Sequence, residues 1–150
     1  MSHSYTSFLV HCVFSTKYRQ KLITPKIRDR LWAYLGGIAR ENKMKALAVG
    51  GVEDHVHVLL SLPSTMSIAK AVQLLKGGSS KWVHDTFPDM QEFAWQEGYG
   101  AFSIGVSGMN ETISYIDNQA AHHRTKSFEE EFVAFLKRNE LVFDSRYVFG

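Results

Sequence analysis

The sequence predicts an α+β fold in which an antiparallel sheet carries two helices on one face. Segments with apolar residues at every second position, typical of half-buried strands, alternate with segments whose apolar residues recur every three or four positions, typical of amphipathic helices. These segments follow one another in the order β-α-β-β-α-β-β-α-α. This order is typical of a ferredoxin-like arrangement, in which helices cover one face and leave the other open.

The first four elements are predicted from local patterns. Residues 5–14 alternate between apolar and polar side chains and are predicted to form a strand. Thr24-Pro25 begins a helix that Asn42 ends, because Pro is favoured in the first helical turn and Asn near helix ends. A second strand at 44–51 leads through two glycines into a third that contains residues 54–60, as a hairpin or a bulged continuation would.

The second half of the chain is predicted in the same way. Polar residues after Pro63 cap a helix that runs to about Thr86. Two short strands follow, then a helix from about 109 to 123 that bears Tyr115, and a last helix from about 128 to 139; the short strands are expected at 93–95 and 99–106. The chain has no repeat or low-complexity tract, so we expect one domain spanning residues 1–150.

Composition narrows the class of protein. A chain of 150 residues that is 45% hydrophobic can bury a substantial core. The single cysteine, Cys12, excludes an internal disulfide, and the sequence contains neither a signal-peptide pattern nor a run of about 18 apolar residues, so we expect a cytoplasmic protein. A net charge of +2 is too small to identify a nucleic-acid-binding protein by itself.

The most informative motif is a pair of histidines, His55 and His57, two positions apart in a predicted strand. Both rings then project from one face, while Val56 and Val58 line the other. Two parallel imidazoles can bind one divalent metal, although a pair of purely structural strand histidines is also compatible with the pattern. Glu53 shares the histidine face, where it can orient an imidazole or simply be solvated.

A second motif, Tyr115 with Gln119, lies on the predicted helix at a spacing of four, so both side chains share one face. A phenol oxygen can attack phosphorus, and an amide oxygen can complete a metal site begun by two imidazoles. Taken alone, the tyrosine fits a core position and the glutamine a surface position; together with the histidine pair they favour a catalytic site. At the helix end, His122 and His123 fit favourable charge at a helix C-terminus, with DNA contact as the alternative.

The combination resembles the single-tyrosine HUH transposases of bacterial insertion sequences, the TnpA type, and their REP-associated tyrosine transposase relatives. HUH denotes histidine, bulky hydrophobe, histidine, and Val56 fills the middle position. The resemblance extends along most of the chain, through residues 14–19, 55–57, 75–82, 98–103 and 115–119. Five ordered similarities are far more specific than one motif.

The resemblance implies cleavage and rejoining of single-stranded DNA at hairpin-marked element ends. Tyr115 would attack a backbone phosphate and form a 5′-phosphotyrosine link, without a nucleotide cofactor. His55, His57 and Gln119 would hold Mg²⁺ or Mn²⁺, of which Mn²⁺ accepts imidazole more readily. The resemblance also implies a homodimer in which the tyrosine helix of each subunit completes the histidine site of the other.

Basic residues beside polar or aromatic ones are predicted to contact DNA phosphates. Lys17 and Arg19 flank Tyr18 in the densest cationic stretch of the sequence. A second group lies on the predicted second helix and comprises Lys76, Ser79, Ser80 and Lys81. The alternative for both groups is a solvated surface.

Three other functions are alternatives to transposition. A two-histidine phosphoesterase would need a second His-x-Thr or His-x-Ser, which the sequence lacks. A small-molecule metal enzyme would need a third acidic or histidine ligand that the sequence does not obviously offer. A domesticated protein that grips hairpin DNA without transposition would have the same fold, and the presence of every expected catalytic position argues against it.

Overall fold

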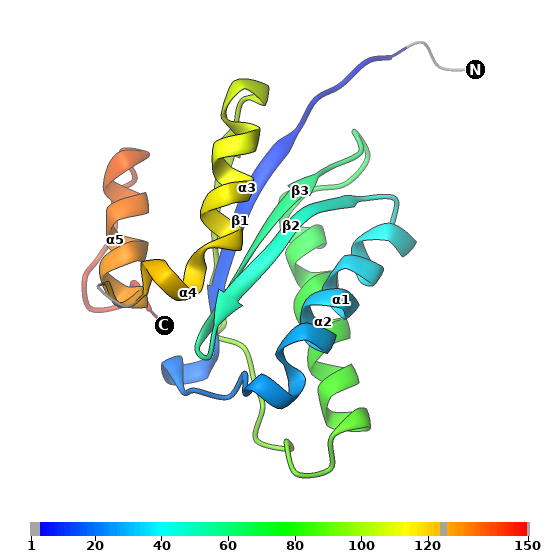
Figure 1. The fold of residues 1–150 in the computed structure, drawn as a ribbon. Helices are drawn as coiled ribbons and strands as arrows, with labels where there is room; N and C mark the ends of the chain where they lie inside the picture. Colours follow the sequence, from blue (N-terminus) through cyan, green and yellow to red (C-terminus); the bar gives the residue numbers. More distant parts are fainter. Residues whose placement is uncertain (1–3, 124–125, 150) are drawn as a thin grey trace.

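The structure is a computed structural model that describes residues 4–123 and 126–149. A four-stranded antiparallel sheet has the strand order β2-β3-β1-β4, with β1 at Leu9–Ser15, β2 at Lys45–Val52, β3 at His55–Ser61 and β4 at Gly100–Ile104. Helices α1 (Pro25–Glu41) and α2 (Ile68–Thr86) lie on one face; α3 (Met109–Asp117), α4 (Gln119–His122) and α5 (Phe128–Arg138) lie on the other (Figure 1). None of the helices in the described ranges is long and apolar enough to span a membrane.

The predicted α+β class and antiparallel sheet are confirmed, with two local differences. The segment 93–95 forms no strand; Trp95 makes a single bridge to Thr16 instead, and its ring packs edge-on against Phe14 in the core. The predicted tyrosine helix is interrupted at Asn118, where the side-chain amide donates to the carbonyl of Ser114 at 2.8 Å. Such local hydrogen bonds compete with helix continuation, which explains the break between α3 and α4.

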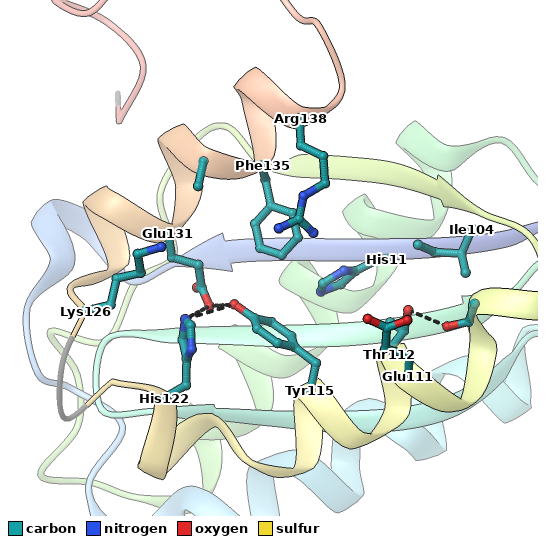
Figure 2. A pocket seen from close by; sticks show the side chains of 12 residues that line it. His11, Ile104, Glu111, Thr112, Tyr115, His122, Lys126, Glu131, Phe135 and Arg138 are labelled. Carbon is teal, nitrogen blue, oxygen red and sulfur yellow. Dashed lines mark hydrogen bonds and ion pairs between the residues drawn. The ribbon is translucent and has the colours of Figure 1, made fainter.

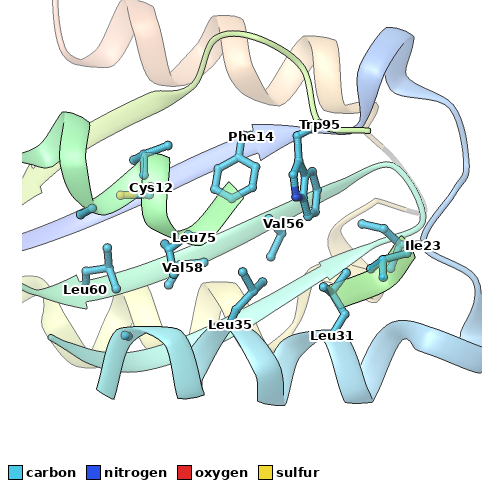
Figure 3. Packing of buried hydrophobic residues seen from close by; sticks show 14 of the residues in the cluster. Cys12, Phe14, Ile23, Leu31, Leu35, Val56, Val58, Leu60, Leu75 and Trp95 are labelled. Carbon is cyan, nitrogen blue, oxygen red and sulfur yellow. The ribbon is translucent and has the colours of Figure 1, made fainter. Parts of the chain in front are cut away.

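The principal core lies between the sheet and helices α1 and α2 (Figure 3). Strand β3 contributes Val56, Val58 and Leu60 to it, as the alternation in the sequence predicts. Cys12 is buried in the same cluster, and burial raises the pKa of its thiol to about 12. This cysteine is therefore a packing residue.

The opposite face of the sheet is not open, which corrects the sequence-based expectation. Helices α3 and α5 cover it because each has an apolar stripe of its own. Ile116 packs on Leu59, and Phe128 and Phe132 pack with Val13. Side chains that were expected to face solvent are thus enclosed between the sheet and three helices.

Helix α3 approaches strand β2 closely at Gly50. A Cβ atom at this position would collide with the carbonyl oxygen of Ile116. Strands β2 and β3 form a hairpin in which Val52 pairs with His55. The glycine therefore lets the helix that carries Tyr115 lie directly against the hairpin that carries the histidines.

Candidate active site

The two histidines of β3 project together from the covered face. His55 and His57 are fully buried, opposite Ser15 and Val13 of β1. Their Nε2 atoms lie 3.4 and 3.0 Å from Oε1 of Glu131, which extends from α5. Both imidazoles thus point to one location, as their spacing predicts.

Each imidazole is oriented through its other nitrogen. Nδ1 of His55 lies 2.7 Å from Oδ1 of Asp54, and Nδ1 of His57 lies 2.8 Å from Nε2 of His11. Glu53, the orienting residue considered from the sequence, is exposed, and the adjacent aspartate takes that role. Partners at Nδ1 leave Nε2 available as the ligand atom. Burial lowers the pKa of His57 to about 4, which favours the neutral imidazole that metals bind.

Tyr115 and Gln119 reach the same location from the helices. Oε1 of Gln119 lies 3.0 Å from Nε2 of His55. The hydroxyl of Tyr115 donates a hydrogen bond to Oε2 of Glu131 and lies 3.2 Å from Nε2 of His122. Burial and the neighbouring Glu131 carboxylate raise the pKa of the phenol above its ordinary value. One chain therefore brings the tyrosine, the glutamine and both histidines together.

Glu131 was not identified from the sequence, where it is one of three consecutive glutamates, Glu129 to Glu131. The three glutamates differ in the structure: Glu129 forms a surface ion pair with Arg19, Glu130 completes the capping box of α5, and Glu131 is only 2% exposed. Burial alone would raise the pKa of Glu131, but its contacts with His123 and His57 hold it well below the usual range. A buried carboxylate lies where the histidines converge.

His123 is the second residue that the sequence did not reveal as part of the site. Its Nε2 atom is buried, lies 3.3 Å from Oε2 of Glu131, and forms no hydrogen bond with any residue that the structure describes. The ligand atoms of His55, His57, His123 and Glu131 all lie within 4.8 Å of one another. Converging imidazole and carboxylate donors of this kind fit a divalent metal.

A cavity of about 380 Å³ lies between α3 and α5, beside the tyrosine (Figure 2). Tyr115 and Glu131 line it, as do the cationic side chains of Lys126 and Arg138. Cations around a cavity that also contains a phenol hydroxyl provide a suitable environment for a phosphate group.

The predicted DNA contacts near the first strand lie on a short 3₁₀ turn, η1 (Lys17–Arg19). Tyr18 and Arg19 have positive φ angles of 58° and 56°, and Tyr18 is 72% exposed. The ammonium of Lys17 lies 5.5 Å from the centre of that ring. The turn therefore presents an aromatic ring and a cation to solvent.

The predicted contacts on α2 lie across the sheet from the histidines. Lys76 donates hydrogen bonds to the carbonyl oxygens of Gln96, Glu97 and Gly98, and Lys81 pairs with Asp85. Ser79 is fully buried, and its hydroxyl bonds to the carbonyl of Leu75. Burial places the hydroxyl of Ser79 out of reach of a phosphate, while Ser80 is partly exposed.

Residues 4–119 match the family described as IS200-like transposases. The chain belongs to this family. The match supports the resemblance drawn from the sequence motifs and indicates a DNA-cleaving transposase. It ends at Gln119, so His123 and Glu131 lie beyond the matched residues.

Individual relatives agree with this assignment. The chain is 26% identical to the ISDra2 transposase TnpA of Deinococcus radiodurans over 114 residues, which are 73% of this chain and 81% of that protein. It is 28% identical to the transposase for insertion sequence element IS200 of Salmonella typhimurium over 111 residues, which are 70% and 72% of the two chains.

Two solved structures have a similar fold. A candidate transposase from D. radiodurans R1 is 25% identical, with a TM-score of 0.64 over 79% of this chain and 95% of that chain. A REP-associated tyrosine transposase bound to a REP hairpin has a TM-score of 0.58 over 82% and 74% of the two chains. At 15% identity the second structure shows the shared fold alone.

Proposed function

We propose that this transposase cuts and rejoins single-stranded DNA at hairpin-marked element ends through a covalent link between Tyr115 and a 5′ phosphate. The observation that carries the proposal is the position of the Tyr115 hydroxyl, beside the converging histidines and at the wall of an accessible cavity. The chain shares its fold with a transposase solved with a REP hairpin, and on this likeness we take hairpin DNA as the proposed substrate class. Because the substrate is DNA, we place the activity in the cytoplasm.

The proposed step exchanges one phosphodiester for another. The phenol oxygen of Tyr115 forms a bond to phosphorus, the bond from phosphorus to the 3′ oxygen breaks, and the phenol proton ends on the released 3′-hydroxyl. Rejoining is the reverse attack by a 3′-hydroxyl. Since the bond energy is conserved in the phosphotyrosine, no nucleotide cofactor is required.

His55, His57 and Gln119 would hold the divalent metal, Mg²⁺ or Mn²⁺. When bound, the ion supplies positive charge that withdraws electron density from the phosphoryl oxygens. Asp54 and His11 keep the two imidazoles oriented toward it. The protein itself positions the phenol, and Lys126 and Arg138 add positive charge around the cavity.

Lys17 and Arg19 are the proposed phosphate contacts near the start of the fold, with Tyr18 available for base stacking. Ser80 and Lys81 remain proposed contacts on the other side of the sheet. Lys76 donates to three backbone carbonyl oxygens and the hydroxyl of Ser79 is buried, so we assign these two residues structural roles.

The proposed assembly is a homodimer, and its active sites can be organised in two ways. Tyr115 contacts Glu131 and lies 5.7 Å from the His57 ring, between centres, within one chain. These contacts support a site completed by a single subunit. Exchange of tyrosine helices between subunits is the alternative.

The test is covalent capture. The protein is incubated with end-labelled single-stranded oligonucleotides that contain hairpins, in the presence of Mn²⁺, and the products are separated under denaturing conditions. We expect a protein–DNA adduct that Tyr115→Phe abolishes while hairpin binding persists, and that the control Tyr34→Phe on α1 leaves unchanged. Hairpin binding without an adduct in the unaltered protein would instead identify a domesticated DNA-binding protein.

A further inference from the structure

Two side chains of the site lie beyond residue 119, where the family match ends. Glu131 directs Oε1 toward the Nε2 atoms of His55 and His57, and Oε2 toward Nε2 of His123. That His123 nitrogen is buried and forms no hydrogen bond within the described residues. The C-terminal segment thus adds a carboxylate and an imidazole to the histidine pair.

The spacing of these atoms is compatible with one coordination sphere. The Nε2 atoms of His55 and His57 lie 3.4 and 3.0 Å from Oε1 of Glu131, and Nε2 of His123 lies 3.3 Å from Oε2 of the same carboxylate. Ligand atoms around a tetrahedral ion, each about 2.0–2.2 Å from the metal, lie roughly 3.3–3.6 Å from one another. All four ligand atoms lie within 4.8 Å of one another, so the most widely separated donors would have to move closer together to share one ion.

We propose that Glu131 and His123 bind the divalent metal together with His55 and His57, and that the ion thereby joins α5 to β3. This inference rests on the proposed metal site of the transposase and adds two ligands to it. Gln119, with Oε1 3.0 Å from Nε2 of His55, lies beside this set as a further oxygen donor.

The donor set determines which ion the site prefers. Three imidazoles and one carboxylate suit Mn²⁺ or Zn²⁺, whereas Mg²⁺ prefers oxygen ligands in octahedral geometry. Glu131 has a second task because its Oε2 accepts the hydrogen bond from the hydroxyl of Tyr115. One carboxylate therefore connects the metal ligands to the nucleophile.

The test measures metal binding without DNA. Metal-free full-length protein is titrated with Mn²⁺ and, separately, with Mg²⁺ by calorimetry. We expect one Mn²⁺ per chain, bound at least about 10-fold more tightly than Mg²⁺, because imidazole ligands favour the transition ion. Glu131→Gln and His123→Ala should each weaken Mn²⁺ binding at least about 10-fold, since loss even of outer partners costs that much.

The matched control is Glu129→Gln, which removes the same charge from an exposed position of α5 and should leave Mn²⁺ affinity unchanged. A second readout is hydrogen exchange of α5 amides, which Mn²⁺ should slow in the unaltered protein but not in Glu131→Gln. Circular dichroism without metal checks folding. If Glu131→Gln does not fold, His123→Ala decides the question, because its side chain lies outside α5.

Two results would overturn the inference: no Mn²⁺ binding by the unaltered protein, or unchanged affinity in both ligand variants. The proposed function can be contradicted independently of this inference. Tyr115→Phe removes no metal ligand and should bind Mn²⁺ normally, so a protein that binds Mn²⁺ through Glu131 yet forms no DNA adduct contradicts only the cleavage proposal. An adduct together with unchanged metal binding in the ligand variants contradicts only the inference about Glu131 and His123.

Discussion

The two faces of strand β3 use neighbouring residues in opposite ways. Toward α1 and α2, Val56, Val58 and Leu60 join an apolar core in which shape and volume are the main requirements. Toward α3, α4 and α5, His55 and His57 meet a network of buried polar partners. The comparison shows that one face chiefly stabilises the fold, while the other holds groups whose position matters for chemistry.

The largest expected effect is on the polar face. His57→Ala removes one of the two β3 imidazoles, so metal-dependent cleavage should fall below detection in the covalent adduct assay. Hairpin binding, measured by gel shift, should remain. Normal cleavage by this variant without added metal would place the active site elsewhere.

On the apolar face, the effect should appear in stability. Phe14→Ala leaves a cavity beside Trp95 and should lower the free energy of unfolding by about 3–5 kcal/mol in urea denaturation. Mn²⁺ affinity of the folded variant should stay near that of the unaltered protein. A large loss of metal affinity in the folded state would show that the two faces are coupled.

A smaller effect is expected outside both faces, on the η1 turn. Lys17→Ala should flatten the salt dependence of single-strand binding by about 0.7 log units of affinity per log unit of salt, the value for one lost phosphate contact. Lys26→Ala, a control on α1 whose ammonium pairs with Asp89, should leave the slope unchanged. Equal slopes for Lys17→Ala and the unaltered protein would leave Lys17 as a solvated side chain.

The last prediction concerns a mixture of two inactive variants, in which we expect no recovery of DNA cleavage. Tyr115→Phe and His57→Ala proteins are mixed under conditions in which subunits exchange, and adduct formation is measured. If each chain assembles its polar face alone, the two lesions stay in separate sites and the mixture remains inactive. Recovered cleavage would demonstrate that tyrosine helices are shared between subunits of a homodimer.

The sequence was sufficient to identify those site residues that stand at the spacing of a strand or a helix. The alternation in β3 placed His55 and His57 on one face, and the helical spacing of Tyr115 and Gln119 brought both toward it. The family resemblance then linked the two motifs, which are far apart in the sequence. The spacing of apolar residues in the sequence was sufficient to predict the apolar core, because burial there depends on the hydrophobic pattern more than on specific partner residues.

Glu131 and His123 escaped detection because long-range packing distinguishes them from their neighbours. The signal that was present is helical phase: Glu131 follows Phe128 by three positions and precedes Phe135 by four, so it lies on the apolar stripe of α5. The same stripe, together with that of α3, implied that a second face of the sheet had to be covered. A small-molecule metal enzyme was disfavoured from the sequence because no third acidic or histidine ligand was evident. His123 and Glu131 are candidates for that role, so this argument no longer holds. The family match is what now favours a transposase over a small-molecule metal enzyme.

Because glycine has no side chain, Gly50 determines how close the hydroxyl of Tyr115 lies to the metal ligands. A phenol has a fixed length and only two rotatable bonds, so the distance from its oxygen to the imidazoles depends on how deeply the backbone of α3 lies on β2. At Gly50 that depth is limited by the main-chain carbonyl of Ile116, the residue next to Tyr115. A methyl group here, on a strand with no catalytic residue, would lift the helix and withdraw the attacking oxygen from the metal ligands.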